Sequence, residues 1–276
     1  MTTYDGITAL VTGASKGIGA CYARQLAARG ANLVLVARSE SALEELASQL
    51  RSAHNVQVDV IAADLFDRDA PRTVVDALTE RGIEVDLLIN NAGLSAVGPF
   101  LTRPLQPNID SVDLNITTLM GLVHIIGARM LERNRGGIIN VSSVAGFQPM
   151  PFQASYGATK AFVLSFTEAL AEELRGTRLR VMAVHPGPVD TGFFDGTTAK
   201  LNPKAVTPER IAAKSLLDFE RGRTASFPGG LNDRANALAS RFLTRKRVVR
   251  ISASFNRKSG LDAVSDVNSP ASDKAR

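Results

Sequence analysis

The 276-residue sequence has little of what marks secreted, membrane-spanning or metal-binding proteins. Its single cysteine, Cys21, excludes an intramolecular disulfide and suits a reducing cytoplasm. No apolar run approaches the ~18 residues of a transmembrane helix, and the first residues resemble no signal peptide. The three histidines are scattered, and no cluster of His, Cys and Asp accompanies them, so we expect no metal site. These absences predict a soluble, cytoplasmic protein.

Acidic residues are scarce in the last fifth of the chain. Residues 219–276 hold 12 Lys and Arg against 5 Asp and Glu, a balance of +7, whereas residues 1–218 hold 20 against 22, a balance of −2. The most basic stretch, Arg241–Arg250, combines five basic residues with mostly apolar ones. Such a segment suits weak contact with an anionic membrane surface, or it is a solvated helix that packs its apolar side on the body. No nucleic-acid motif accompanies it, and we expect no nucleic-acid partner.

Short apolar runs alternate with helical patterns along most of the chain. This alternation predicts an α/β fold, a Rossmann-like doubly wound parallel sheet in a single domain with helices on both faces. We expect a catalytic domain over residues 1–255, a basic extension at about 231–255 and a disordered tail over 256–276. The predicted strands are 7–13, 32–38, 56–65, 85–93, 137–142 and 180–185, and the main predicted helices are 17–30, 41–50, 71–81, 111–132, 156–176 and 208–221.

A glycine-rich loop follows the first predicted strand. In TGASKGIG, Gly13, Gly17 and Gly19 lie where a strand leads into a helix. Glycine there lets the backbone turn sharply and approach a pyrophosphate, whose charge the helix N-terminus receives. One glycine would indicate only a tight turn, but three at this spacing in the first βα unit indicate a dinucleotide site, with Ser15, Lys16 and Ile18 in the same loop.

The end of the second predicted strand distinguishes NADP(H) from NAD. An acidic side chain there binds the ribose 2′-hydroxyl, whereas an arginine accommodates the 2′-phosphate. The sequence has Arg38 at this point and no carboxylate before Glu40, and Lys16 adds a second cation. Either residue alone could be a solvated surface charge, but together they favour NADP(H).

Tyr156 and Lys160 lie four residues apart at the start of a predicted helix, on one face and about 6 Å apart along its axis. A free tyrosine has a pKa near ~10, and a nearby ammonium lowers it toward the range useful for acid/base catalysis. Taken alone, this is an ordinary helical pair. Ser143 and Asn115, however, are also expected at the carboxyl edge of the sheet, beside the glycine loop.

These motifs together resemble the short-chain dehydrogenase/reductase family. TGASKGIG, NNAG (Asn90–Gly93), Asn115, Ser143, YGATK and HPGPVDT (His185–Thr191) occur in the family's order over about residues 5–195. The resemblance implies that Tyr156 is the acid/base, that Lys160 binds the nicotinamide ribose and lowers the tyrosine pKa, that Ser143 binds the substrate oxygen, and that Asn115 holds a relay water. It further implies that Pro186–Thr191 closes over the nicotinamide. The residues that would contact the cofactor are Asp64, Leu65, Asn91, Ala92, Gly93, Tyr156, Lys160, Pro186, Gly187, Val189 and Thr191.

The implied reaction is hydride transfer between NADP(H) and a ketone or aldehyde. The expected substrate segments, Leu94–Ser95, Gly146–Phe152 and the loop with Phe193 and Phe194, are mostly apolar and favour a lipophilic small molecule. Two alternatives stay open: a 3-oxoacyl-thioester reductase of fatty-acid type, and a non-catalytic NADP(H)-binding regulator. The resemblance implies a homodimer or homotetramer, although the extension after Ser226–Gly230 departs from the pattern of many tetrameric members.

Overall fold

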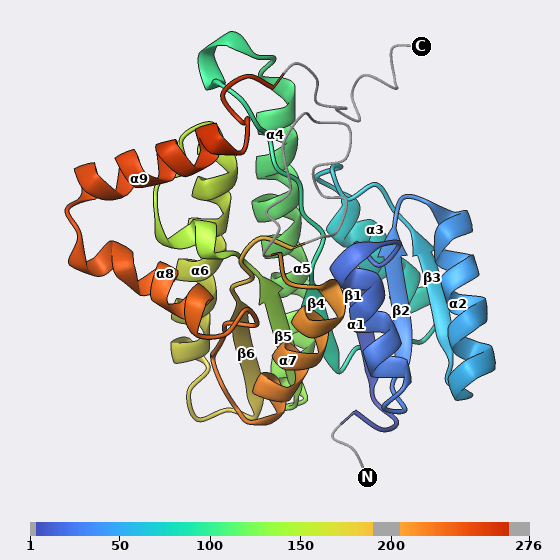
Figure 1. Cartoon of the computed structure of the whole chain (residues 1–276). Helices are drawn as coiled ribbons and strands as arrows, with labels where there is room; N and C mark the ends of the chain where they lie inside the picture. Colours follow the sequence, from blue (N-terminus) through green and yellow to red (C-terminus); the bar gives the residue numbers. More distant parts are fainter. Residues whose placement is uncertain (1–3, 190–204, 265–276) are drawn as a thin grey trace.

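The computed structural model describes residues 4–189 and 205–264. Seven parallel strands form one sheet in the order β3-β2-β1-β4-β5-β6-β7, which confirms the doubly wound α/β fold (Figure 1). The crossover from β3 back to β4, on the other side of β1, produces the point at which ligands bind in such sheets. The strands are β1 (Thr8–Thr12), β2 (Asn32–Ala37), β3 (Val58–Ala62), β4 (Leu87–Asn90), β5 (Gly136–Val141), β6 (Leu179–Val184) and β7 (Ala225–Ser226).

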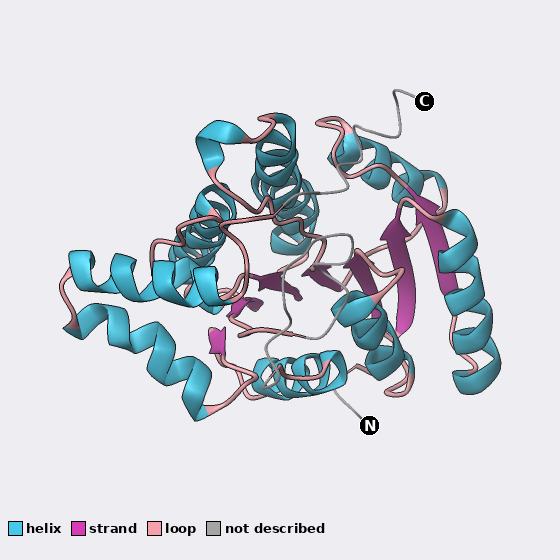
Figure 2. Ribbon diagram, turned by 45° about the horizontal axis from the view of Figure 1, so that its top comes forward, coloured by secondary structure: helices cyan, strands magenta, loops and turns pink. Residues whose placement is uncertain are grey.

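Helices cover both faces of the sheet, as Figure 2 shows. One apolar core joins the sheet to α1, α2 and α7, through residues such as Tyr22, Leu43 and Ile211. The other joins it to α3, α5 and α6, through residues such as Val74 and Leu122. The helices are α1 (Gly17–Ala27), α2 (Glu40–His54), α3 (Ala70–Glu80), α4 (Gln106–Val112), α5 (Leu119–Glu132), α6 (Ala154–Glu173), α7 (Pro208–Glu220), α8 (Leu231–Phe242) and α9 (Arg245–Lys258), with short 3₁₀ helices η1 (Phe100–Thr102) and η3 (Val144–Phe147).

The long helix expected at 111–132 begins earlier and changes its winding. Helix α4 continues into α5 through a π-helical turn, η2 (Asp113–Thr118). The span Gln106–Glu132 is long and apolar enough to cross a membrane, but half of its most apolar window is buried inside the molecule, as in a core helix. Single π-turns inside helices are frequent at functional sites, and this one contains Asn115.

The parallel pairing places the carboxyl ends of the central strands side by side. Val11 pairs with Ile89, Asn90 with Asn140, and Val141 with Val184. The residues that follow these strands therefore meet at one edge of the sheet. That edge receives the glycine loop, the NNAG segment, Ser143 and the loop after β6.

Two expectations about the C-terminal part need correction. The boundary expected at residue 255 is wrong, because α9 continues to Lys258 and the chain then packs Leu261 and Val264 against Val97. The apolar pattern there is too short to be recognised without its partner loop. The basic segment Arg241–Arg250 is not one helix either, since it is divided by the turn between α8 and α9. Residues 265–276 lie outside the described part.

Only the two ends of the loop expected between Pro186 and Pro208 are described. Val189 and Val206 form an isolated parallel bridge, so the loop begins and ends on neighbouring segments. Thr191, Phe193 and Phe194 lie outside the described residues.

Candidate active site

The glycine loop is shaped by close packing of its own backbone. Gly13 and Gly17 have φ values of +65° and +58°, a left-handed conformation that other residues adopt at a cost. Gly19 lies in the first turn of α1 against the Gly13 carbonyl, and a Cβ on Gly19 would overlap that carbonyl. These glycines leave the backbone of the first turn of α1 free to approach a bound pyrophosphate.

The ends of β1 and β4 are joined by the Thr12 hydroxyl. Its oxygen accepts hydrogen bonds from the backbone N–H groups of Asn91 and Ala92, both at 3.0 Å. The Asn91 side chain donates to the Thr12 carbonyl at 2.9 Å. The floor of the predicted dinucleotide site is therefore preformed, and a Cβ on Gly13 would lie only 3.0 Å from the Ala92 Cα. Only glycine fits this packing, which is the tight strand-to-helix turn that a dinucleotide site requires.

The residues expected to select NADP(H) lie beside this loop with exposed side chains. Arg38 follows β2, and its guanidinium lies 5.1 Å from the Phe66 ring centroid. Lys16 is the N-cap residue of α1. The Gly13 N–H donates to the Val36 carbonyl at 2.8 Å, so the end of β2 and the loop are directly connected. Neither cation has a carboxylate partner among the described residues' ion pairs, which leaves both charges available to a phosphate.

The residues expected near the adenine follow β3. Asp64 is exposed, and its side chain accepts a hydrogen bond from the Phe66 N–H at 3.2 Å. Leu65 is buried, and its carbonyl accepts from the Thr118 hydroxyl at 2.8 Å. Helix η2 thereby holds the end of β3 next to the strand edge.

Tyr156 and Lys160 share one face of α6, as the spacing predicts. The Lys160 ammonium lies 5.8 Å from the Tyr156 ring centroid and donates to the Val141 carbonyl at 2.8 Å. Burial lowers the pKa of Lys160 to about 8. Burial also raises the pKa of Tyr156 to about 12, and a hydrogen bond with the Ser143 hydroxyl acts in the opposite direction. Burial is the larger of these two effects on Tyr156, and the lowering of its pKa by Lys160 that the resemblance implies stays a prediction.

Ser143 connects the tyrosine to the loop after β6. Besides its hydrogen bond with Tyr156, its hydroxyl donates to the Pro186 carbonyl at 3.3 Å and accepts from the Ala145 N–H at 3.1 Å. It is the N-cap residue of η3 and is 8% exposed. The hydroxyl is thus fixed in place at the end of β5, with its environment almost closed to solvent.

Asn115 joins three segments of the site through its buried amide. The side-chain oxygen accepts from the Leu94 N–H at 2.9 Å, and the amide donates to the Leu94 carbonyl at 2.8 Å and to the Thr159 hydroxyl at 3.0 Å. Gly93 is needed beside it, because a Cβ there would lie 3.2 Å from the Asn115 amide oxygen and 3.5 Å from the Lys160 ammonium. Asn115, Ser143, Tyr156 and Lys160 therefore occupy the same strand edge as the glycine loop.

Two polar residues near this edge are not apparent from the sequence. His185 is fully buried between Phe147 and Phe227, with ring centroids 4.9 and 5.0 Å away, and neither of its ring nitrogens has a hydrogen-bond partner. Burial lowers its pKa to about 4. Asp233, in the first turn of α8, accepts a hydrogen bond from the Gly187 N–H. The rings beside His185 lie 38 and 42 residues away in sequence, and Gly187 lies 46 residues from Asp233, so no local pattern reveals these contacts.

The substrate segments lie against the C-terminal helices. Ser95 is buried and accepts a hydrogen bond from the Gln153 side chain at 3.0 Å. The Pro151 carbonyl accepts from the Asn256 side chain at 2.7 Å, and Phe152 packs on the cluster of Val97, Leu261 and Val264. Two hydrogen bonds and one small apolar cluster thus connect this side of the site to neighbouring segments.

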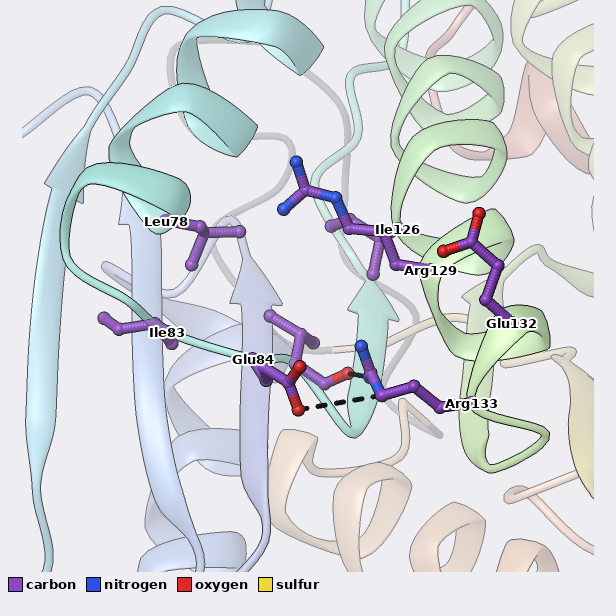
Figure 3. Close-up of a pocket in the computed structure, with 8 residues that line it drawn as sticks. Leu78, Ile83, Glu84, Ile126, Arg129, Glu132 and Arg133 are labelled. Atoms are coloured by element: carbon purple, nitrogen blue, oxygen red, sulfur yellow. Dashed lines mark hydrogen bonds and ion pairs between the residues drawn. The ribbon is translucent and has the colours of Figure 1, made fainter.

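Another concave region lies away from this edge. Figure 3 shows a pocket between the C-terminal ends of α3 and α5, near the start of β4, lined by Leu78, Ile126 and several charged residues. An ion pair of 3.8 Å between Arg133 and Glu84 crosses it. The pocket lies at the amino end of β4, beside Ile83–Val85, whereas the glycine loop follows the carboxyl end of β1. It is therefore separate from the candidate active site. Within the described residues no group of three His, Cys, Asp or Glu side chains is arranged to hold a metal ion.

Comparisons with known proteins agree on one family. The sequence profile of the short chain dehydrogenases matches residues 7–202. An NADP-dependent 3-hydroxy acid dehydrogenase from Schizosaccharomyces pombe is 36% identical over 235 residues, which cover 80% of this chain and 90% of that protein. A very-long-chain 3-oxoacyl-CoA reductase from Anas platyrhynchos is 37% identical over 185 residues, 66% of this chain and 59% of that protein.

Solved structures show the same similarity. A bulky-bulky ketone specific alcohol dehydrogenase from Comamonas testosteroni superposes with a TM-score of 0.75 at 35% identity, covering 86% of this chain and 92% of that one. A short-chain dehydrogenase from Sphingobium yanoikuyae in complex with NADPH gives 0.77 at 31% identity, covering 95% and 99%. Another, from Burkholderia phymatum, was solved with NAD and gives 0.77 at 25% identity, covering 98% and 100%.

Proposed function

Because this chain belongs to the short-chain dehydrogenase/reductase family of oxidoreductases, we propose that it interconverts a lipophilic ketone or aldehyde and the corresponding alcohol with NADP(H). The observation that carries the proposal is the placement of Ser143, Tyr156, Lys160 and Asn115 at the strand edge that also bears the glycine loop. A protein that only bound the nucleotide would need the loop but not the other four side chains.

In this mechanism NADPH, when bound, supplies the hydride for the carbonyl carbon. Tyr156 donates its proton to the carbonyl oxygen, because a hydroxyl with a pKa of about 12 is protonated at neutral pH. Ser143 hydrogen-bonds the same oxygen. Lys160 lies behind the tyrosine and is mostly protonated at neutral pH, so it stabilises the phenolate that forms. The Asn115 amide hydrogen-bonds both the Leu94 backbone and Thr159 on α6. It thereby fixes the position of the helix that carries Tyr156 and Lys160.

The residues proposed to hold the cofactor lie along one path across the strand edge. Two exposed cations, Arg38 and Lys16, support the choice of NADP(H), as do the NADPH complex of the Sphingobium relative and the NADP dependence of the yeast relative. The path also contains Gly13, Ser15, Gly17, Ile18, Gly19, Asp64, Leu65, Asn91, Ala92, Gly93, Pro186, Gly187 and Val189. Thr191, which we also propose as a cofactor residue, lies outside the described part of the chain.

A substrate panel tests the reaction. NADPH consumption should be measured with bulky ketones, aldehydes, steroids and 3-oxoacyl thioesters, and the reverse reaction with the alcohols. Turnover of bulky ketones with NADPH, and markedly poorer turnover with NADH, is the expected result. Equal turnover with NADH would contradict the roles of Arg38 and Lys16, and no turnover of any carbonyl would contradict the proposed reaction.

Reduction of a 3-oxoacyl thioester is the second candidate. It is favoured by the similarity to the Anas reductase and to the yeast 3-hydroxy acid dehydrogenase. The basic surface of α9 near the substrate segments would suit an acidic acyl carrier or the phosphates of an acyl-CoA. Preference for an acyl thioester over a free ketone of equal chain length, lost at high salt, would favour this candidate.

A regulator without catalysis remains the third hypothesis. In that case Tyr156→Phe would leave every cellular phenotype unchanged, while Arg38→Ala, which weakens nucleotide binding, would abolish it.

We also propose a homodimer or homotetramer formed through α5 and α6, because Met120 and Leu131 expose apolar side chains on α5. Sedimentation velocity tests that association, and cell fractionation tests the cytoplasmic location expected from the single cysteine.

A further inference from the structure

The carboxylate of Asp233 is buried between two turns that belong to different parts of the chain. Its Oδ2 accepts hydrogen bonds from the Gly187 N–H at 2.9 Å and from the Gly229 N–H at 3.0 Å. The side chain is only 6% exposed. Hydrogen bonds from backbone N–H groups to a carboxylate are stronger than bonds between neutral groups, so this contact fixes the position of both turns.

Both donors are glycines because the carboxylate leaves no space for a side chain. A Cβ on Gly187 or on Gly229 would overlap the Asp233 carboxyl group. Neither residue has the positive φ that would otherwise require glycine. The sequence thus contains three positions that fit one another, Gly187, Gly229 and Asp233, although 46 residues separate the first from the last.

Gly187 belongs to the loop that begins at the end of β6 beside the catalytic residues. The preceding carbonyl, that of Pro186, accepts hydrogen bonds from the Ser143 hydroxyl at 3.3 Å and from the Val144 N–H at 3.0 Å. Ser143 is in turn hydrogen-bonded with Tyr156. A continuous series of contacts therefore leads from Asp233 on α8 to the proposed proton donor on α6.

The hairpin of α8 and α9 also holds the substrate side of the site, through a different residue. Asn256 on α9 donates to the Pro151 carbonyl at 2.7 Å. Figures 1 and 2 show α8 and α9 as a V beside α6, at the end of the sheet opposite β3. The two contacts lie on separate helices and hold separate loops, so each can be removed without the other.

We propose that Asp233 is a positioning residue that holds the Pro186–Val189 loop in the conformation required by the nicotinamide end of the cofactor. The inference rests on the proposed function for the identity of the ligand. It assigns a role in the site to a helix beyond residues 7–202, where the family profile matches. The simpler role for Asp233, stabilising the N-terminus of α8 alone, predicts a loss of stability but no specific loss of nucleotide affinity.

The experiment compares Asp233→Ala, Asp233→Asn and Asn256→Ala with the wild-type protein. Dissociation constants for NADPH are measured by cofactor fluorescence without substrate, hydrogen exchange of the Gly187 amide is measured without nucleotide, and melting temperatures are recorded for all four proteins. We expect Asp233→Ala to raise the NADPH dissociation constant about tenfold or more and to accelerate Gly187 exchange. Asp233→Asn, whose amide oxygen still accepts both bonds without the charge, should fall between it and the wild type.

Asn256→Ala is the matched control, because it removes one buried side chain–backbone contact from the same hairpin. It should lower the melting temperature to a similar extent and leave the NADPH dissociation constant within about twofold of the wild-type value. Equal weakening of NADPH binding by both variants, or wild-type affinity in Asp233→Ala, would overturn the proposal. If Asp233→Ala does not fold, Asp233→Asn takes its place in the comparison. Wild-type NADPH affinity in Asp233→Asn, or a weakening equal to that in Asn256→Ala, would then overturn the proposal.

The two proposals fail in different ways. If the wild-type protein bound no NADPH, the proposed function would be wrong, whatever the variants do. Unchanged Gly187 exchange in Asp233→Ala would contradict the positioning role even if the wild-type enzyme reduced ketones with NADPH.

Discussion

On the nucleotide side of the molecule, backbone packs against backbone, whereas in the C-terminal hairpin, side chains hold distant loops. Gly19 contacts the Gly13 carbonyl and Gly13 lies against the Ala92 backbone, while the Thr12 hydroxyl and the Asn91 side chain add short hydrogen bonds between the ends of β1 and β4. The hairpin instead acts through Asp233 and a few other side chains that cross to loops elsewhere in the chain. The glycine loop itself is local in sequence and repeats the pattern of its family, while the hairpin depends on contacts over more than a hundred residues, such as Asn256 with Pro151.

The two regions therefore illustrate two ways of building a site, by backbone turns and by buried side-chain contacts. A site made by backbone turns tolerates no added atoms at its glycines but needs few particular side chains. A site held by side chains tolerates changes of surface residues but fails when one buried contact is removed. The proposed catalytic residues lie between the two regions, so variants of these residues and of each region should respond differently.

The largest effect is expected at Tyr156, one of the proposed catalytic residues between the two regions. Tyr156→Phe removes the proton donor but keeps the ring, so turnover should fall by about 10²- to 10⁴-fold. NADPH affinity and the melting temperature should stay near wild-type values, because the ring is kept and at most one hydroxyl contact to the nucleotide is lost. NADPH oxidation with the best ketone of the panel and fluorescence titration measure the two quantities. Full activity in this variant would contradict the mechanism.

On the nucleotide side, Gly19→Ala should weaken NADPH binding by about two orders of magnitude. Its methyl group would overlap the Gly13 carbonyl, and the backbone of the loop would have to move to accommodate it. Gly127→Ala in α5 is the matched control. Its Cβ would make only an ordinary 3.4 Å contact with Ile138, and alanine favours a helix by about 0.5–1 kcal/mol. Titration with NADPH and thermal unfolding distinguish them, and equal behaviour of the two variants would show that the loop is not built by close backbone packing.

Among the side chains buried by distant partners, His185 should make the protein sensitive to acid. Its pKa of about 4 in the folded protein is below the ordinary 6.5, so between these values the unfolded chain binds more protons. The free energy of unfolding should therefore fall by about 2–3 kcal/mol as pH decreases from 6.5 to 4. Denaturant unfolding across this range measures it.

The control for this effect is His185→Phe, which fills the space between Phe147 and Phe227 with an uncharged ring. Other carboxylates titrate in both proteins, so the difference between the two pH profiles isolates the histidine. Parallel profiles would show that His185 does not carry the acid sensitivity.

The smallest effect is expected on the outer surface of the hairpin. Arg245, Lys246 and Arg247 are exposed, as are the apolar side chains of Ile251 and Phe255, and no acidic residue occurs from Arg241 to Lys258. Weak, salt-sensitive binding to vesicles containing phosphatidylserine should result, at about 1 kcal/mol per cation near the surface. Replacing the three cations with Gln should reduce cosedimentation a few-fold. Equal binding to neutral vesicles, or none to either kind, would contradict membrane contact.

The local parts of this site are predictable because each depends on neighbours in sequence. The glycine loop, the Tyr156–Lys160 pair and the alternating strands need only the geometry of one βα unit or one helical turn. The boundary at 255 failed for the opposite reason, since Leu261 and Val264 are apolar residues whose partner, Val97, lies more than 160 positions earlier. Polar residues such as Asp233 and His185 have no periodic pattern at all.

The sequence by itself determined the doubly wound sheet, the dinucleotide loop and the family, because strand periodicity, helix spacing and glycine turns are local properties of the backbone. The tertiary structure decided which groups are buried together. It placed Tyr156 and Lys160 where desolvation dominates their pKa values, enclosed His185 between two aromatic rings, and brought Asp233 onto Gly187. Such outcomes depend on the distance and dielectric between residues far apart in the chain, and only the folded chain sets these.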